Sequence, residues 1–288
     1  MYTRLTLVFL ACFLSFLCQA QQTTITIPKT SSNAVRDQYQ LGLLELALGK
    51  ANFSYRIQFE ENLLSQARIV SSLKNPEEGI DLYWMGTSPK LEKELRAVHF
   101  PIYQGLLGYR VFIIHKNQQI EFNKIQSLAD LQRKTGIQGV GWADISILEA
   151  AGLKQQTSQY NSILQMINSG HRHYYFSRGI HEAFAEVDAA KNDYPNLVVD
   201  DNVLLIYPLA MFFFTNKKNE TLANAIENGL KAAHKDGSFH RYFEQEPSTK
   251  RALEKANIKN RRWIRIDNPY LTPETQAINS QYWHKLTR

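Results

Sequence analysis

Residues 80–85 read IDLYWM, a nearly continuous apolar run that suits a β-strand buried on both faces. The segments before it alternate in type. Residues 24–28 and 55–59 have strand patterns, while residues 36–50 and 63–74 carry apolar side chains at helical spacing. The order strand, helix, strand, helix, strand predicts an α/β fold that begins with a parallel sheet.

The alternation of strands and helices continues along the chain. Strand patterns occupy residues 106–114, 136–140, 173–176, 196–200 and 207–215. Helical patterns occupy residues 127–134, 145–151, 180–191 and 220–235, and the last of these ends at Asp236-Gly237. Two α/β units therefore follow each other, and the strands at 106–114 and 207–215 are expected to be the two crossings between them. The tail beyond Pro247 is mostly polar.

The N-terminus has the layout of a secretory signal. Arg4 precedes an apolar run from Leu5 to Leu17, which is too short to be read first as a membrane-spanning helix. Small residues follow, and we expect cleavage after Ala20 and export to the periplasm. A lipoprotein with Cys12 or Cys18 lipidated is the alternative. Both cysteines lie in this segment, so the mature chain has neither a disulfide nor a thiol nucleophile.

Composition limits the classes of partner. Loss of residues 1–20 removes Arg4 and no acidic residue, which leaves 32 basic against 27 acidic residues and a formal charge of +5. No basic run interleaved with aromatic residues is long enough for nucleic-acid binding. No second apolar stretch is long enough to cross a membrane. We expect a soluble, exported monomer.

Four stretches in this order resemble the periplasmic solute-binding proteins of the amino-acid-binding type (family 3). They are GIDLYWMGTSPK at 79–90, VHFPIYQGLLGYRVFII at 98–114, SLADLQRKTGIQGVGWADISIL at 127–148, and LANAIENGLKAAHKDGSFHRYFE at 222–244. No single stretch is specific, but their order and spacing are. The resemblance covers residues 24–244.

The resemblance implies a two-lobe, type II periplasmic binding protein fold. Lobe 1 would comprise residues 21–104 and 207–246, and lobe 2 would comprise residues 105–206. Residues 247–288 would form an extension that packs on lobe 1. Such proteins close around a small-molecule ligand in the cleft between the lobes, and in the family the loaded protein docks on a membrane permease, as in ABC transporters.

In lobe 1, the resemblance places Thr87 and Ser88 in the turn that offers polar groups to the ligand. The arginine that grips an α-carboxylate in the amino-acid binders has no counterpart just beyond this turn. Lys93 is nearest by spacing and Lys90 is the alternative, although a lysine offers a point charge instead of a fork. Arg68 either supplies the missing cation or is a surface helix residue.

In lobe 2, Trp142 lies in a Gly-rich turn before a helix, where it could stack on a flat ligand. Asp144 or Ser146 is the candidate N-cap of that helix, and a helix start suits a carboxylate or phosphate.

Arg178 ends the stretch GHRHYYFSR and takes the place where the amino-acid binders carry an aspartate for the ligand's ammonium. The reversal of charge predicts a ligand with an acidic group facing lobe 2. The alternative is a helix-start ion pair between Arg178 and Glu182, four residues on. His171 and His173 share one strand face, but no third ligand has the spacing of a metal site.

Three functions follow from these patterns. The first is a non-enzymatic solute-binding protein for a small polar, anionic or amino-acid-like solute, and the second is a ligand sensor without a transporter. The third is a periplasmic enzyme on the same scaffold, with Asp144, His173 or Glu182 as acid or base. We rank the enzyme last and expect no cofactor, because no nucleophile elbow, phosphate loop or metal set is recognisable.

Overall fold

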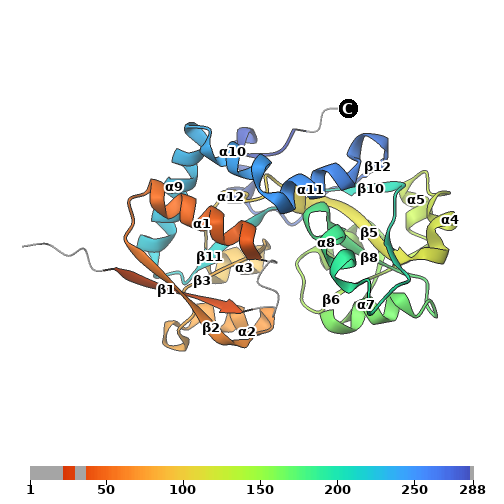
Figure 1. Ribbon diagram of the computed structural model, residues 1–288, viewed down its shortest axis with the longest axis horizontal. Helices are drawn as coiled ribbons and strands as arrows, with labels where there is room; N and C mark the ends of the chain where they lie inside the picture. The colour runs from red at the N-terminus through yellow and green to blue at the C-terminus, as the bar shows by residue number, and fades with distance from the viewer. Residues whose placement is uncertain (1–21, 30–36, 286–288) are drawn as a thin grey trace, which may run out of the picture.

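The computed structural model describes residues 22–29 and 37–285, which form two α/β lobes side by side (Figure 1). The expected signal peptide, its cleavage point after Ala20 and both cysteines lie outside these residues. None of the helices in the described part of the chain has the length and apolar character that a membrane crossing needs.

The first lobe is built on strands β1 and β2, which pair in parallel, and on β11, which is antiparallel to β3 and β4. The backbone bond from Asp81 N to Thr26 O, at 3.0 Å, links β3 to β1. The strands are β1 (Thr23–Lys29), β2 (Tyr55–Leu63), β3 (Leu82–Gly86), β4 (Arg96–Ala97) and β11 (Met211–Thr215). The helices are α1 (Gln38–Lys50), α2 (Gln66–Lys74), α3 (Pro89–Glu94), α9 (Glu220–Lys235) and α10 (Ser238–Gln245).

The second lobe has one mixed sheet with the strand order β12-β10-β5-β8-β6-β7, and β9 pairs with β5. β7, β6 and β8 are parallel, whereas β5 is antiparallel to β8. The strands are β5 (Tyr109–His115), β6 (Thr135–Gly139), β7 (Lys154–Ser158), β8 (Tyr174–Gly179), β9 (Leu197–Val199), β10 (Val203–Ile206) and β12 (Arg262–Arg265). The helices are α4 (Gln119–Phe122), α5 (Leu128–Leu131), α6 (Asp144–Ala150), α7 (Tyr160–Asn168), α8 (Ile180–Ala190) and α11 (Pro247–Ala256).

The crossings between the lobes meet at Gly108 and Tyr207. The Tyr207 amide donates to the Gly108 carbonyl at 3.0 Å, and a Cβ on residue 108 would lie 1.8 Å from the Tyr207 carbonyl oxygen. Only glycine lets the two backbones approach this closely. The expected crossing strand at 106–114 starts later, at Tyr109, because residues 106–108 form a 3₁₀ turn.

The apolar runs of the sequence form the cores of the sheets. All five residues of β11 are buried, as are six of the seven in β5. Helix α9 packs against α1 so closely that a Cβ on Gly229 would lie 1.8 Å from the Ala47 carbonyl oxygen. The amphipathic pattern predicted for residues 220–235 therefore corresponds to a helix whose apolar face is covered by α1.

The C-terminal tail was expected to pack on lobe 1, but it contacts both lobes. Helix α11 packs on α8, and the Lys255–Asp188 ion pair joins them at 2.6 Å. Strand β12 then pairs in parallel with β10 at the edge of the second-lobe sheet. Beyond it, helix α12 (Pro273–Gln276) returns to the first lobe, where the Thr275 hydroxyl donates to Glu92 at 2.9 Å. The tail therefore ties the two lobes together.

Candidate ligand cleft

A cavity of about 760 Å³ lies between the two lobes. The first lobe lines it with the starts of α1 and α2 and the end of β3, where Gln40, Gln66 and Gly86 lie. The second lobe lines it with the end of β8, the turn before α6 and most of α8. The start of α11 adds a further wall. The volume suits a small-molecule ligand, and the carboxyl ends of β3 and β8 open into it.

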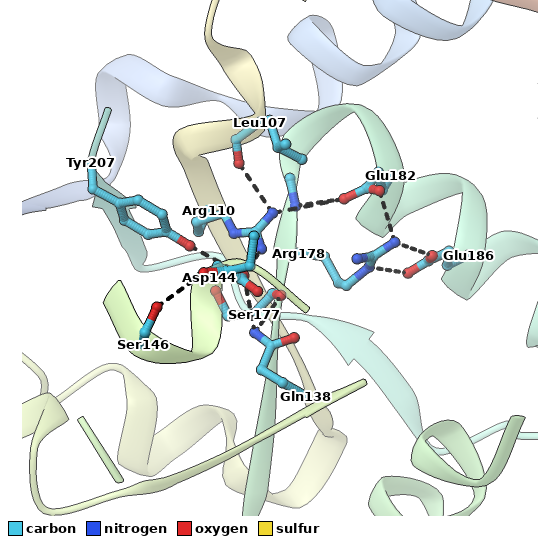
Figure 2. Close-up of polar contacts among 12 residues, drawn as sticks. Leu107, Arg110, Gln138, Asp144, Ser146, Ser177, Arg178, Glu182, Glu186 and Tyr207 are labelled. Carbon is cyan, nitrogen blue, oxygen red and sulfur yellow. Dashed lines mark hydrogen bonds and ion pairs between the residues drawn. The ribbon is translucent and has the colours of Figure 1, made fainter. Parts of the chain in front are cut away.

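Arg178 is the central charged residue of the second-lobe wall, and its side chain is only 5% exposed. Its guanidinium donates from Nε and Nη2 to both carboxylate oxygens of Glu186, at 2.8 and 2.6 Å (Figure 2). Nη2 also lies 2.9 Å from Glu182. Burial lowers the pKa of Arg178, but the two glutamates outweigh burial and raise it overall. The guanidinium is therefore held charged between two carboxylates.

Arg110, at the start of β5, is the second buried cation. It forms an ion pair with Asp144 and donates to the Leu107 carbonyl at 3.0 Å (Figure 2). Tyr207 donates its hydroxyl to the same Asp144 carboxylate at 3.3 Å. Asp144 therefore joins the first residues of α6 to both crossings, which fixes the second-lobe wall relative to the hinge.

Aromatic rings surround the Arg178 guanidinium. Its Cζ lies 4.7 Å from the centroid of the Trp142 ring and 5.1 Å from that of Phe176. The Trp142 and Phe176 rings are themselves stacked at 5.8 Å. Such a cation–π arrangement stabilises a desolvated guanidinium and holds Trp142 in place.

A stack of three rings links the lobes beside the cavity. Tyr39 of α1 stacks on Tyr103 at 4.2 Å, and Tyr103 stacks on His181 of α8 at 4.0 Å. Both ring nitrogens of His181 are buried without a hydrogen-bond partner among the described residues. Burial lowers the His181 pKa to about 4, and the nearby cations Arg178 and Arg110 act in the same direction. His181 is therefore neutral at pH 7.

No protein-family model and no curated protein matches the chain. Solved structures do. An ancestral arginine-binding protein bound to arginine has a TM-score of 0.57 at 16% identity, covering 78% of this chain and 98% of its own. An ancestral amino-acid-binding protein, a precursor of cyclohexadienyl dehydratase, has a TM-score of 0.56 at 16% identity, covering 77% and 94%. A histidine kinase sensor domain with similarity to periplasmic binding proteins has a TM-score of 0.54 at 13% identity, covering 77% of this chain and 94% of its own.

The chain has the two-lobe fold of the periplasmic amino-acid-binding proteins. This confirms the expected fold class, and the cavity lies where that fold has its interlobe cleft. At 16% identity or less, the likeness establishes the fold alone and leaves the solute to be argued from this chain's own residues.

Three of the residues predicted for the cleft line the cavity, namely Trp142, Asp144 and Arg178. Either Asp144 or Ser146 was expected as the N-cap of α6, and that prediction is wrong. Ala143 is the N-cap, and it makes no side-chain cap bond, because Asp144 is already the first helical residue and pairs with Arg110. The alternative ion pair of Arg178 with Glu182 is present.

The other four predicted residues lie outside the cavity lining. Arg68 is exposed on α2 and pairs with Glu78 at 2.9 Å. Ser88 caps α3 by accepting from the Leu91 amide, and Lys93 is exposed on the same helix. Thr87 is buried and donates to Glu92 at 2.5 Å.

Several lining residues carried no signal at the sequence level. Arg110 lies within an apolar strand, and Glu186 lies eight residues after the arginine that it pairs with. Gln40 and His181 have no motif around them. Of the two partners of Arg178, the sequence indicated Glu182 at i+4 but not Glu186 at i+8, one turn further along the helix. His171 and His173 are exposed, and no group of three or more His, Cys, Asp or Glu side chains within the described ranges is placed to hold a metal.

Proposed function

We propose that the protein is a non-enzymatic, extracytoplasmic solute-binding protein that captures a small polar solute between its lobes. One observation carries this function: the interlobe cavity is lined from both lobes, and its second-lobe wall holds the buried, paired cations Arg110 and Arg178. A cleft of this kind binds most tightly when both walls contact the solute, which is how binding is coupled to closure.

The expectation of an anionic solute depended on an Arg178 that is free to receive it. Glu182 and Glu186 already balance that charge. An acidic solute would have to compete with two part-buried carboxylates, so Arg178 alone does not determine the charge of the solute.

The partner in this proposal is a membrane permease of the ABC type. The alternative partner is a sensor protein, which is supported by the structural likeness to a histidine kinase sensor domain. Loss of solute uptake on deletion of the gene, with solute-dependent gene expression unchanged, would support the permease. The opposite pattern would support the sensor.

A catalytic role is not proposed. Asp144 forms an ion pair with Arg110, Glu182 forms one with Arg178, and His173 is exposed and outside the cavity lining. None of the three is placed as an available acid or base in the cleft.

The test is a thermal-shift screen of residues 21–288 against amino acids, dicarboxylates, amines and short peptides. A solute at a hundredfold excess over its Kd adds about 2.7 kcal/mol to the stability of the folded state. Trp142→Ala in the cavity wall should abolish the shift, while Glu149→Gln on the exposed face of α6 should retain it. Failure of every compound class to shift the melting temperature would overturn the function.

A further inference from the structure

The cavity lining carries a surplus of negative charge. Within the described residues, three arginines and seven Asp and Glu side chains line it, a formal charge of −4, or −3 once the ion pair of Asp188 with Lys255 outside the lining is counted. Two of the arginines, Arg110 and Arg178, are buried and paired with carboxylates of the same cavity. The third, Arg251, is an exposed residue of α11. No buried cation is left over for an acidic solute, whereas the surplus carboxylates favour a positively charged one.

The lining also contains buried hydrogen-bond acceptors that have no donor, which is an observation independent of its charge. Gln40 is 7% exposed, and its Oε1 atom is buried without a partner among the described residues. A buried carbonyl oxygen without a hydrogen-bond partner destabilises the empty cleft until a donor reaches it. Both nitrogens of the neutral His181 ring are in the same condition, and in a neutral ring one of them is an acceptor. N–H groups on the solute would satisfy these acceptors.

The cavity walls are also aromatic in both lobes. Trp84 of β3 and Tyr83 beside it line the first-lobe side, and Tyr160 and Phe184 line the second-lobe side. Aromatic faces attract desolvated cations, and the cation–π contact of Arg178 with the Trp142 ring is an example in this protein. A carboxylate gains nothing from such faces.

We propose that the solute is a small organic cation, an amine or guanidinium whose positive charge is not balanced by a carboxylate of its own. Its N–H groups donate to Gln40 Oε1, its positive charge lies beside the Glu182 and Glu186 carboxylates, and its carbon chain lies on the aromatic walls. This inference rests on the proposed function and names the chemical class of its solute.

The experiment compares compounds that differ by one carboxylate. Calorimetric titration of residues 21–288 would use cadaverine against lysine and agmatine against arginine, with glutarate as the anion. At least one amine should bind about tenfold or more tightly than its amino acid, a difference of about 1.4 kcal/mol, and glutarate should not bind.

Two variants test the contacts. Glu186→Gln removes a carboxylate and frees Arg178, so it should weaken amine binding by about tenfold or more. For an acidic solute the same change should strengthen binding, so the sign of the effect distinguishes the two. Gln40→Leu removes the unpartnered acceptor without disturbing the ion pairs, so it keeps the test valid if Glu186→Gln does not fold. It should also weaken amine binding, whereas Glu149→Gln on the exposed face of α6 should not.

Tighter binding of glutarate or lysine than of cadaverine, or a gain for an anion in Glu186→Gln, would overturn the inference and leave the proposed function standing. Absence of binding by both amines would overturn it as well. The broader solute screen would then decide separately whether the cleft binds a solute at all.

Discussion

Arg178, at the end of β8, and Glu186, two turns into α8, form a two-pronged ion pair in which both carboxylate oxygens accept from the guanidinium, at 2.8 and 2.6 Å. The strand runs directly into the helix, so residues eight positions apart meet in the cavity wall. Glu182 lies between them and contacts the same guanidinium at 2.9 Å. The site is therefore organised before any solute arrives.

Arg178→Met should lower the free energy of unfolding by about 3–5 kcal/mol, because it leaves two part-buried carboxylates without their cation. The double variant Arg178→Met with Glu186→Met should recover part of that loss. Urea denaturation measures both values, and Lys124→Met at an exposed ion pair should leave the midpoint unchanged. A double variant less stable than Arg178→Met would contradict this prediction and mean that Glu186 stabilises the fold through contacts other than Arg178.

Gly229→Ala should destabilise the first lobe although alanine is the better helix former by about 1 kcal/mol. The added Cβ would lie 1.8 Å from the Ala47 carbonyl oxygen, so α1 and α9 must separate, and such overpacking costs about 1–3 kcal/mol or more. Gly49→Ala is the matched control, since a Cβ there meets no atom within 4 Å. It should leave the melting temperature unchanged or raise it. Equal effects of the two substitutions would show that the α1–α9 approach is not a constraint.

The sequence predicted most of the strands and helices whose apolar pattern is regular, but it missed α7, in which Ile163 and Ile167 are buried four residues apart. Strand β7, KQQTS, is a polar edge strand paired only with β6, so it has no alternation to detect. The short β10 was also missed, although all four of its residues are buried. β10 forms a strand by pairing with β5 and β12, which come from distant parts of the chain.

The candidate cleft was partly predictable for a similar reason. Trp142 and Arg178 could be placed because strand ends open into the crevice of an α/β fold. Glu186 could not be assigned as a partner of Arg178, because it reaches the guanidinium only where β8 runs directly into α8. Thr87 was expected to face the solute, but its hydroxyl donates instead to the carboxylate of Glu92, five residues on. Spacing gives the position of a turn and does not give the direction of each side chain.

His181 should make the protein less stable as the pH falls from about 6.5 to about 4. Burial lowers its pKa to about 4 in the folded state, against 6.5 for an ordinary histidine. Between these values the unfolded chain binds a proton that the folded chain does not, so stability present above pH 6.5 is lost on acidification. The loss attributable to this group is at most about 3 kcal/mol.

Urea denaturation at pH 7 and pH 4.5 measures this loss. His181→Gln should show a smaller fall in unfolding free energy than wild type, and His173→Gln, at an exposed position, should match wild type. If His181→Gln and wild type fall equally, the ring is not the group that titrates.

Glu92→Ala should release the end of the tail from the first lobe. The Glu92 carboxylate accepts from the hydroxyls of Thr87, Thr272 and Thr275 at 2.5, 2.6 and 2.9 Å. Burial raises the Glu92 pKa, but the hydrogen bonds from His99 and the three threonines outweigh it and hold the pKa below its usual value. The carboxylate is therefore charged at pH 7, and its removal leaves three hydroxyls without their acceptor.

Limited thermolysin digestion followed by mass spectrometry would detect the release as faster cleavage within residues 267–285. Glu94→Ala on the same helix is the matched control, because Glu94 forms only a partly exposed ion pair with Lys74. Because β12 stays paired with β10, the second-lobe half of the tail should remain protected in both variants. Cleavage at the same rate in Glu92→Ala and Glu94→Ala would mean that apolar packing, and not this carboxylate, holds the tail on the first lobe.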